Sequence, residues 1–318
     1  MPLPSARHRA GFPPSARAPG LRLVWLRDGQ DWPNRECSHF LRAGGITWHV
    51  QSCGHGPALL LIHGTGASTH SWRALMPLLA QDFTVIAPDL PGHGFTEAPA
   101  RAQLSLPGMA AGIVALVDAL GVRPAVAAGH SAGAAILARA VLDGGLAPRG
   151  LISLNGALLP FRGLPGHFFA PLARLFFAMP ILPMIFSWRA RDRATVERLI
   201  RNTGSMIDPE GIDFYARLMR SPGHVDAVLG MMANWDLDPL VRDLPRLRPP
   251  LAQIIGGADR AIPPSEAEAV RGVLPRAEII MMPGLGHLAH EERPRETAEI
   301  IRRLARGWGV LAAKEGEG

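Results

Sequence analysis

Lysine and cysteine are scarce in this sequence of 318 residues, and each scarcity excludes a class of protein. Lys314 is the only lysine and lies in a stretch of Gly and Glu at the C-terminal end. A phosphate-binding P-loop needs its lysine directly after a glycine-rich turn, so an ATP-driven motor is excluded. The two cysteines, Cys37 and Cys53, are too few for a disulfide framework, and we expect both to be reduced in the cytoplasm.

Nearly all the positive charge comes from arginine, which is scattered along the chain. The formal net charge is +6 and the isoelectric point is about 10.7. Nucleic-acid-binding proteins gather basic and aromatic side chains on one surface, and no such stripe is visible, so we expect no nucleic-acid partner. A weak attraction to an anionic membrane surface stays open, which would make a cytoplasmic protein peripheral to the membrane.

Two stretches could be mistaken for membrane or targeting segments. Residues 1–20 are rich in Pro, Arg and Ala without a continuous apolar core, which predicts a disordered tail. Residues 161–188 are apolar, but arginine, histidine and several prolines interrupt them, so a membrane-spanning helix is not expected. We interpret this stretch as cap helices, with a lid that grips an apolar substrate or touches a membrane as the alternative.

Strands and helices alternate in two parts of the chain. A hairpin is expected at 38–52, and helices are expected at 71–80, 105–120, 132–142 and 294–308. Strands are expected at 58–62, 84–87, 125–128, 150–154, 251–255 and 278–282, and the continuous apolarity of 58–62 suits a strand buried on both faces. This order predicts a mostly parallel, doubly wound α/β sheet, built from residues 21–157 and 248–312. The helical block at 158–247 predicts a cap inserted between them.

The sequence Gly-His-Ser-Ala-Gly at 129–133 lies between an expected buried strand and an expected helix. A serine at the tip of such a turn adopts a strained backbone, and flanking glycines let the strand and helix approach each other. The turn exposes the hydroxyl of Ser131 near the positive end of the helix. In isolation the motif also fits an ordinary glycine-rich turn, but this context predicts a nucleophile.

An earlier glycine-rich loop, His-Gly-Thr-Gly at 63–66, follows another buried strand. A tetrahedral acyl intermediate carries an oxyanion that needs two fixed N–H donors. We expect the backbone N–H groups of Ala132 and Thr65 to supply them. Alone this run is weak evidence for an oxyanion site, because glycine turns after strands are common. Its place in the order of strands and helices before Ser131 makes it informative.

A nucleophilic serine needs a base, and the base needs an orienting acid. Asp259 and His287 both follow strands of the second core segment, at the edge where open α/β sheets gather their sites. We predict the triad Ser131, His287 and Asp259. His290 as base, and Asp236 or Asp238 as acid, are the alternatives.

Other chemistry finds less support. His287, His290 and Glu291 suggest a metal, but the H-E-x-x-H spacing that places two histidines on one helix face is absent. The Gly-Thr-Gly at 64–66 does not continue as a dinucleotide-binding G-x-G-x-x-G. We therefore expect neither a metal nor a cofactor.

With these motifs in their order, the chain resembles the α/β-hydrolase superfamily over nearly its whole length beyond the tail. At finer grain it is similar to the magnesium-chelatase accessory hydrolases of bacteriochlorophyll biosynthesis. The residues that carry this finer resemblance are 27–35, 63–73, 153–157, 220–224, 231–236 and 286–294.

The resemblance implies a role in photosynthetic pigment synthesis, near the insertion of magnesium into protoporphyrin. One hypothesis is an enzyme that hydrolyses an ester, thioester or amide of a bulky apolar small molecule, such as a tetrapyrrole. The other is an accessory protein that binds a porphyrin or magnesium-chelatase subunits, with an idle triad. Serine at the nucleophile position argues against dehalogenases and epoxide hydrolases, which carry aspartate there.

Overall fold

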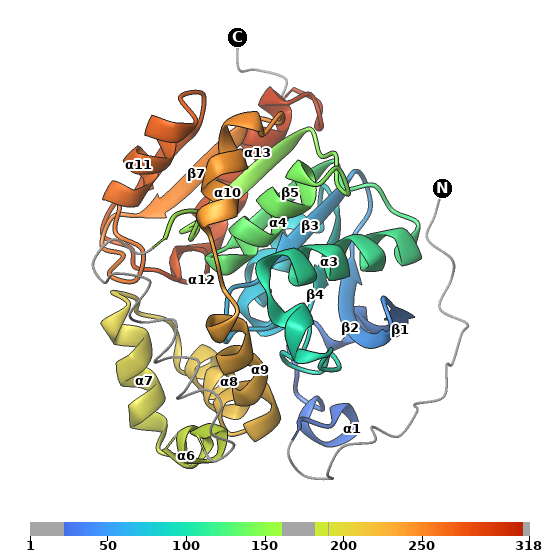
Figure 1. The fold of residues 1–318 in the computed structure, drawn as a ribbon, viewed down its shortest axis with the longest axis vertical. Helices are drawn as coiled ribbons and strands as arrows, with labels where there is room; N and C mark the ends of the chain where they lie inside the picture. The colour runs from blue at the N-terminus through green and yellow to red at the C-terminus, as the bar shows by residue number, and fades with distance from the viewer. Residues whose placement is uncertain (1–21, 161–181, 190, 314–318) are drawn as a thin grey trace.

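The computed structural model describes residues 22–160, 182–189 and 191–313. Within these ranges eight strands form one sheet, in the order β1-β2-β4-β3-β5-β6-β7-β8 (Figure 1). The strands are β1 (Ser38–Ala43), β2 (Ile46–Cys53), β3 (Ala58–Ile62), β4 (Thr84–Pro88), β5 (Val126–His130), β6 (Gly150–Leu154), β7 (Leu251–Gly256) and β8 (Glu278–Met282). β2 pairs antiparallel with β1 and β4, and the pairs from β4 to β8 are parallel.

The strand order creates a topological switch point at the centre of the sheet, which we call the crevice. From β3 the chain moves to one neighbour, β4, and then returns past β3 to the other neighbour, β5. The loops that leave the carboxyl ends of β3 and β5 therefore diverge, and such a switch point is where open α/β sheets bind ligands. Residues 63–66 follow β3 and Ser131 follows β5, so the sheet brings both predicted motifs to this point.

Helices cover both faces of the sheet. They are α2 (Leu75–Leu79), α3 (Leu106–Leu120), α4 (Ala132–Leu142), α10 (Asp238–Asp243), α11 (Ser265–Val273), α12 (Ala289–Glu292) and α13 (Pro294–Gly307). α3, α4 and α10 lie in front of the sheet in Figure 1. Leu60 and Ile62 of β3 face the cluster that includes α3 and α4, whereas Leu59 and Leu61 face the cluster that includes α2 and α13. Alternate residues of one strand thus build two cores, which explains its continuous apolarity.

The helices between β6 and β7 form a group below the sheet in Figure 1. They are α6 (Leu182–Arg189), α7 (Arg193–Asn202), α8 (Pro209–Met219) and α9 (Pro222–Ala233), and α10 follows them. Ile200 of α7 and Tyr215 of α8 pack in one cluster with Ala67 and Leu288, which belong to the loops of the crevice. Leu240 of α10 instead joins the sheet core beside α4. The cap boundary at 247 stays a prediction.

Most expected elements are confirmed. The hairpin at 38–52, the six further strands, and the helices expected at 105–120, 132–142 and 294–308 all form, and only the last strand, β8, is largely exposed at the edge of the sheet. The helix expected at 71–80 is instead a 3₁₀ turn, η2 (Thr69–Trp72), followed by α2. Pro77 explains the break, because its ring would clash with the carbonyl of Arg73 in a continuous helix. The tail at 1–20 and the apolar stretch at 161–181 lie outside the described residues.

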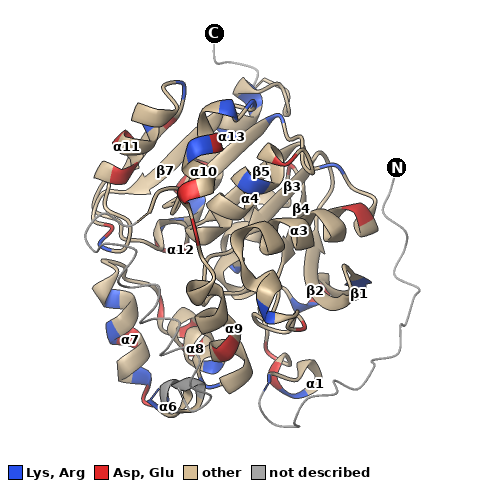
Figure 2. Ribbon diagram, in the orientation of Figure 1, with Lys and Arg blue, Asp and Glu red and all other residues tan. Residues whose placement is uncertain are grey.

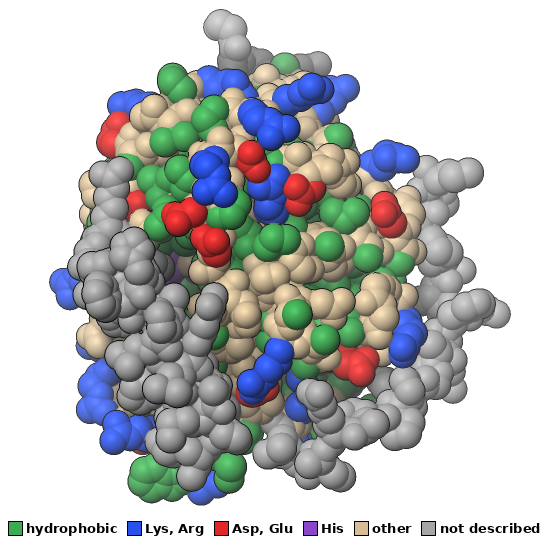
Figure 3. Space-filling model, in the orientation of Figure 1, with side chains coloured by type: hydrophobic (Ala, Val, Ile, Leu, Met, Phe, Trp, Pro, Cys, Tyr) green, Lys and Arg blue, Asp and Glu red, His purple; other side chains and the backbone are tan. Residues whose placement is uncertain are grey.

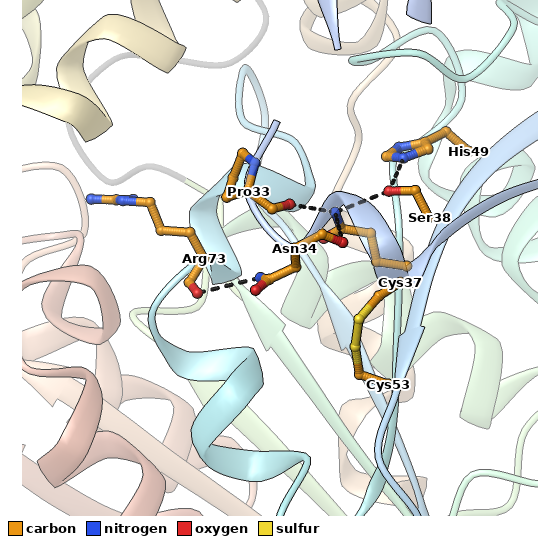
Figure 4. Close-up of a disulfide and its surroundings, with 8 residues drawn as sticks. Pro33, Asn34, Cys37, Ser38, His49, Cys53 and Arg73 are labelled. Atoms are coloured by element: carbon orange, nitrogen blue, oxygen red, sulfur yellow. Dashed lines mark hydrogen bonds between the residues drawn. A yellow bond between two sulfur atoms is a disulfide. The ribbon is translucent and has the colours of Figure 1, made fainter. Parts of the chain in front are cut away.

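Three short elements and the N-terminal helix complete the described structure: η1 (Arg35–Cys37), η3 (Arg101–Leu104), η4 (Leu244–Arg246) and α1 (Trp25–Asp28). Our expectation that both cysteines are reduced is wrong, since Cys37 and Cys53 form a disulfide (Figure 4). Cys37 ends η1 and Cys53 ends β2, which runs beside β1, so chain pairing brings their Cα atoms to 5.5 Å. Two cysteines are too few for a disulfide framework, but the pairing of β1 with β2 brings these two close enough to form a single disulfide.

Basic and acidic positions are interspersed along the ribbon (Figure 2). Near α10, Arg139 forms ion pairs with Asp143 and Asp243, and Arg246 forms one with Asp243. Figure 3 shows basic and acidic side chains next to one another on the face in view. Such pairing neutralises part of the positive charge locally. No helix in the described ranges is both long and apolar enough to cross a membrane. Contact with a membrane surface stays a prediction.

Candidate active site

Ser131 lies in a strained turn between β5 and α4. Its φ of 52° and ψ of −120° are unusual for a residue with a side chain. A Cβ at Gly133 would overlap the backbone oxygen of Ile62 in β3, so only glycine lets α4 start this close to the sheet. The backbone of Ser131 is held by hydrogen bonds to and from the β6 end, from Ser131 N to Leu154 O (3.0 Å) and from Ala157 N to Ser131 O (3.1 Å). The sequence therefore folds into the turn that the motif predicts.

The loop after β3 lies directly against this serine. A Cβ at Gly64 would be 2.9 Å from the Cβ of Ser131, so glycine permits the approach. His63 fixes the start of the loop, since its Nδ1–H donates to Gly64 O (2.8 Å) and its Nε2 accepts from Leu90 N (2.8 Å). Thr65, one of the two predicted oxyanion donors, follows in this loop, and Ala132, the other, begins α4.

Asp259 and His287 form a buried pair. The Nδ1–H of His287 donates to Asp259 Oδ2 at 2.8 Å. The other carboxylate oxygen, Oδ1, accepts from the backbone N–H groups of Ala261 (2.8 Å) and Ile262 (2.9 Å). These donors fix the orientation of the carboxylate. Because Nδ1 of His287 carries the hydrogen that Asp259 accepts, Nε2 is left as the proton acceptor.

Asn155 also holds this acid, a contact that sequence reasoning missed. Its Nδ2–H₂ donates to Asp259 Oδ2 at 2.8 Å and to the carbonyl of Gly286 at 3.3 Å. The residue has a φ of 46°, in the left-handed region that asparagine tolerates better than most residues. The available signal was an asparagine directly after β6, but nothing in its spacing showed that β6 brings it to the acid.

His130 connects the serine turn to the histidine loop. Its Nε2–H donates to the backbone oxygen of His287 at 2.9 Å, and the two rings are 4.7 Å apart. The residue after His130 is Ser131, so the turn and the imidazole of His287 are neighbours. Within the described ranges the Ser131 hydroxyl makes no hydrogen bond to His287. Such bonds are often long before substrate binds and shorten in the substrate complex.

The alternative base, His290, is engaged elsewhere. Its Nε2–H donates to Ser71 Oγ (2.8 Å), and Ser71 in turn donates to Glu291 Oε1 (2.7 Å). Glu291 also accepts from Tyr215 OH (2.7 Å) and forms an ion pair with Arg73. Burial lowers the pKa of His290 to about 3. This geometry favours His287 as the base.

The alternative acids, Asp236 and Asp238, are exposed at the start of α10. Asp236 Oδ1 accepts from the backbone N–H of Asp238 at 3.0 Å, so it stabilises the turn that begins the helix. Neither carboxylate bonds a histidine within the described residues. Among all the residues that the structure describes, no group of three or more His, Cys, Asp or Glu side chains could hold a metal ion.

A second set of serine, histidine and aspartate lies at the antiparallel edge of the sheet. Ser38 OH donates to His49 Nε2 (3.0 Å), and His49 Nδ1–H donates to Asp89 Oδ2 (2.8 Å); Figure 4 shows Ser38 and His49. Gln51 donates to the Ser38 hydroxyl oxygen at 3.2 Å. Burial alone would raise the pKa of Asp89, but His49 and backbone donors hold it below its ordinary value.

The fold and this crevice define the class of protein. The profile of the alpha/beta hydrolase family matches residues 59–300. The chain therefore belongs to the alpha/beta hydrolase family. An alpha/beta hydrolase from Nostoc sp PCC 7120 shares the fold with a TM-score of 0.71 and 24% identity, over 84% of this chain and 96% of that one. A thermophilic esterase from Thermogutta terrifontis shares the fold with a TM-score of 0.66 and 24% identity, over 85% of this chain and 98% of that one.

Two relatives are similar in sequence over most of their lengths. The magnesium-chelatase 30 kDa subunit of Rhodobacter capsulatus is 40% identical over 263 residues, which are 82% of this chain and 92% of the relative. Pyrrolizixenacetamide deacetylase of Xenorhabdus hominickii is 31% identical over 260 residues, 78% of this chain and 91% of the relative. The resemblance to magnesium-chelatase-associated hydrolases is thus confirmed at the level of sequence similarity.

Proposed function

We propose that this chain is a serine hydrolase that transfers an acyl group from an ester, thioester or amide to water. The observation that carries the proposal is the buried 2.8 Å hydrogen bond from His287 to Asp259, next to a serine in a strained strand-to-helix turn. Ser131 attacks the carbonyl carbon while His287 Nε2 accepts its proton. Asp259 orients the imidazole and stabilises its charged form.

The backbone donors complete the proposed mechanism. The N–H groups of Ala132 and Thr65 bind the oxyanion that forms when Ser131 attacks. His287 then returns its proton to the leaving group, which departs and leaves an acyl-serine. A water molecule, deprotonated by His287, attacks this ester, and the acid is released with Ser131 restored.

The apolar side chains beside the loop support an apolar substrate. Met219 of α8 lies beside Gly66 and is partly exposed, whereas Met231 of α9, which contacts Thr65, is buried. Thioether side chains adapt to bulky apolar groups. Similarity to the magnesium-chelatase 30 kDa subunit supports a role near magnesium insertion into protoporphyrin in bacteriochlorophyll synthesis. The proposed substrate is therefore a bulky apolar acyl compound, with a tetrapyrrole ester as the specific candidate. The cytoplasm is the proposed location, where a disulfide such as Cys37–Cys53 is uncommon.

The second candidate is an accessory protein that binds a porphyrin or chelatase subunits without catalysis. It is favoured by the name of the relative, which describes a chelatase subunit. A paired test separates the two: fluorophosphonate labelling of the purified protein, and pigment formation in cells that carry Ser131→Ala. The enzyme predicts labelling at Ser131 and loss of pigment in the variant. Absence of labelling, or normal pigment with Ser131→Ala, contradicts it.

A further inference from the structure

The cap helix α9 contacts the loop that carries the proposed oxyanion donor Thr65. His224, in the first turn of α9, is buried, and its Nε2–H donates to the carbonyl of Gly66 at 3.3 Å. Its Nδ1 accepts from the backbone N–H of Gly94 at 3.2 Å. The second bond fixes the tautomer, because an unprotonated Nδ1 leaves the hydrogen on Nε2. One imidazole therefore joins two loops that follow β3 and β4.

A second residue of the same helix reaches the adjacent loop position. The Thr65 hydroxyl donates to the sulfur of Met231 at 3.7 Å. His224 and Met231 are seven residues apart, or about two helical turns, so both side chains lie on one face of α9. Helix α9 thus contacts both Thr65 and Gly66.

Helix α9 is itself held against the core at a tight contact. A Cβ at Gly92 would overlap the Cβ of Ala227, which lies one turn after His224. Only glycine at residue 92 lets the turn after β4 approach this closely. The position of His224 relative to Gly66 is therefore set by backbone packing, not by the His224 side chain alone.

The loop needs such support, because glycines on both sides of Thr65 restrict its backbone little. Gly66 has a φ of 80°. The bonds from His63 Nδ1–H (2.8 Å) and Ala67 N–H (3.2 Å) both hold the carbonyl of Gly64, at the start of the loop, and leave the Gly66 carbonyl to His224. An oxyanion donor acts only if its N–H is already aimed when charge develops.

We propose that His224 is a positioning residue for the oxyanion loop, so that the inserted cap sets the geometry of the Thr65 N–H. This inference rests on the proposed serine hydrolase. The bond to Gly66 O orients the end of the loop, and Met231 restrains the Thr65 side chain. The cap then contributes to the reaction step itself, in addition to any part it has in binding substrate.

The test compares His224→Leu, which removes both hydrogen bonds, with His224→Gln, whose amide offers a donor and an acceptor at similar reach. We expect His224→Leu to slow fluorophosphonate labelling of Ser131 and to weaken binding of phenylboronic acid, whose tetrahedral adduct places an oxygen at the oxyanion position. Misplaced donors cost about tenfold to a hundredfold in such reactions. His224→Gln should recover most of both losses.

Val225→Ala is the matched control, because Val225 is a buried neighbour on α9 and makes none of these loop bonds. It should lower the melting temperature without slowing the labelling. If His224→Leu does not fold, His224→Asn replaces it, since its shorter amide does not span both loops. Wild-type labelling rates and boronate affinity in a folded His224→Leu or His224→Asn would overturn the inference. An unlabelled wild-type protein would instead overturn the proposed hydrolase.

Discussion

Two sets of serine, histidine and aspartate lie on opposite sides of the sheet centre, and they differ in an instructive way. In the edge set, Ser38, His49 and Asp89 form a continuous chain of hydrogen bonds. In the proposed triad the His287–Asp259 bond is present, while Ser131 is not yet bonded to the imidazole. By hydrogen bonds alone, the edge set is the more complete.

The backbone reverses this ranking. Ser38 begins an ordinary strand, paired with Gln51, whose side chain also donates to its hydroxyl oxygen. Ser131 has a positive φ and precedes the first turn of α4, with the Gly64 loop against it. Strain of this kind persists only where surrounding structure imposes it, and it is concentrated at functional sites. The difference teaches that turn geometry and N–H donors distinguish a nucleophile better than a chain of polar contacts.

The largest expected effect separates the two serines directly. Ser131→Ala should abolish fluorophosphonate labelling and reduce ester hydrolysis by about 10⁴-fold or more, because the nucleophile is lost. Ser38→Ala should leave the labelling rate within about twofold, since Ser38 belongs to the edge set. Mass spectrometry of the labelled peptide checks both variants. A label on Ser38 would break the comparison.

The two aspartates should affect different quantities. Asp259→Asn should lower kcat/KM by about 10³- to 10⁴-fold, because His287 loses the partner that fixes its tautomer. Asp89→Asn should leave labelling intact in the folded fraction but lower the free energy of unfolding by about 1.5–3 kcal/mol for each hydrogen bond that the buried carboxylate loses. Urea unfolding and labelling kinetics, measured on both variants, distinguish these outcomes. Equal loss of activity in the two would contradict our assignment.

Asn155 should have an intermediate effect. Asn155→Ala removes a hydrogen bond to the Asp259 carboxylate, and such bonds contribute about 1.5–3 kcal/mol, or roughly 10- to 100-fold in rate. We expect the loss in kcat with little change in KM. Gln51→Ala, which removes a donor to Ser38, is the matched control and should leave kcat unchanged. An unaltered kcat in Asn155→Ala would limit the residue to a structural role.

The smallest effect, counted per residue and per pH unit, is a pH dependence of stability. Burial lowers the pKa of His224 and His290 to about 3, whereas in the unfolded chain a histidine titrates near about 6.5. Between these values the unfolded state binds more protons, so stability falls as the pH is lowered from about 6.5 towards 3. Each residue contributes up to about 1.4 kcal/mol per pH unit. Chemical unfolding at pH 7 and pH 5 measures this, and a shallower slope is expected for His224→Gln.

Much of the fold followed from local patterns. The buried strands and the glycine-flanked serine were predictable because continuous apolar runs and a tight turn are written in neighbouring residues. The edge set, Asn155 and His224 were not, because the contacts His49–Asp89, Asn155–Asp259 and His224–Gly66 join residues 40 to 158 positions apart that only the sheet order and the cap bring together. The disulfide was missed for a similar reason, since our expectation came from the number of cysteines and not from the pairing of β1 with β2.

The ion pair of Arg73 with Glu291 belongs to a set of bonds that joins helix α8 to the core beside the crevice. Glu291 follows the loop that carries His287. Tyr215 of α8 donates a hydrogen bond to Glu291, and Arg73 also forms an ion pair with Asp208 at the start of α8. An outward movement of α8 would break the hydrogen bond from Tyr215 to the buried Glu291 carboxylate and the ion pair of Arg73 with Asp208. The same acidic side chain that follows the proposed base therefore also ties α8 to the core.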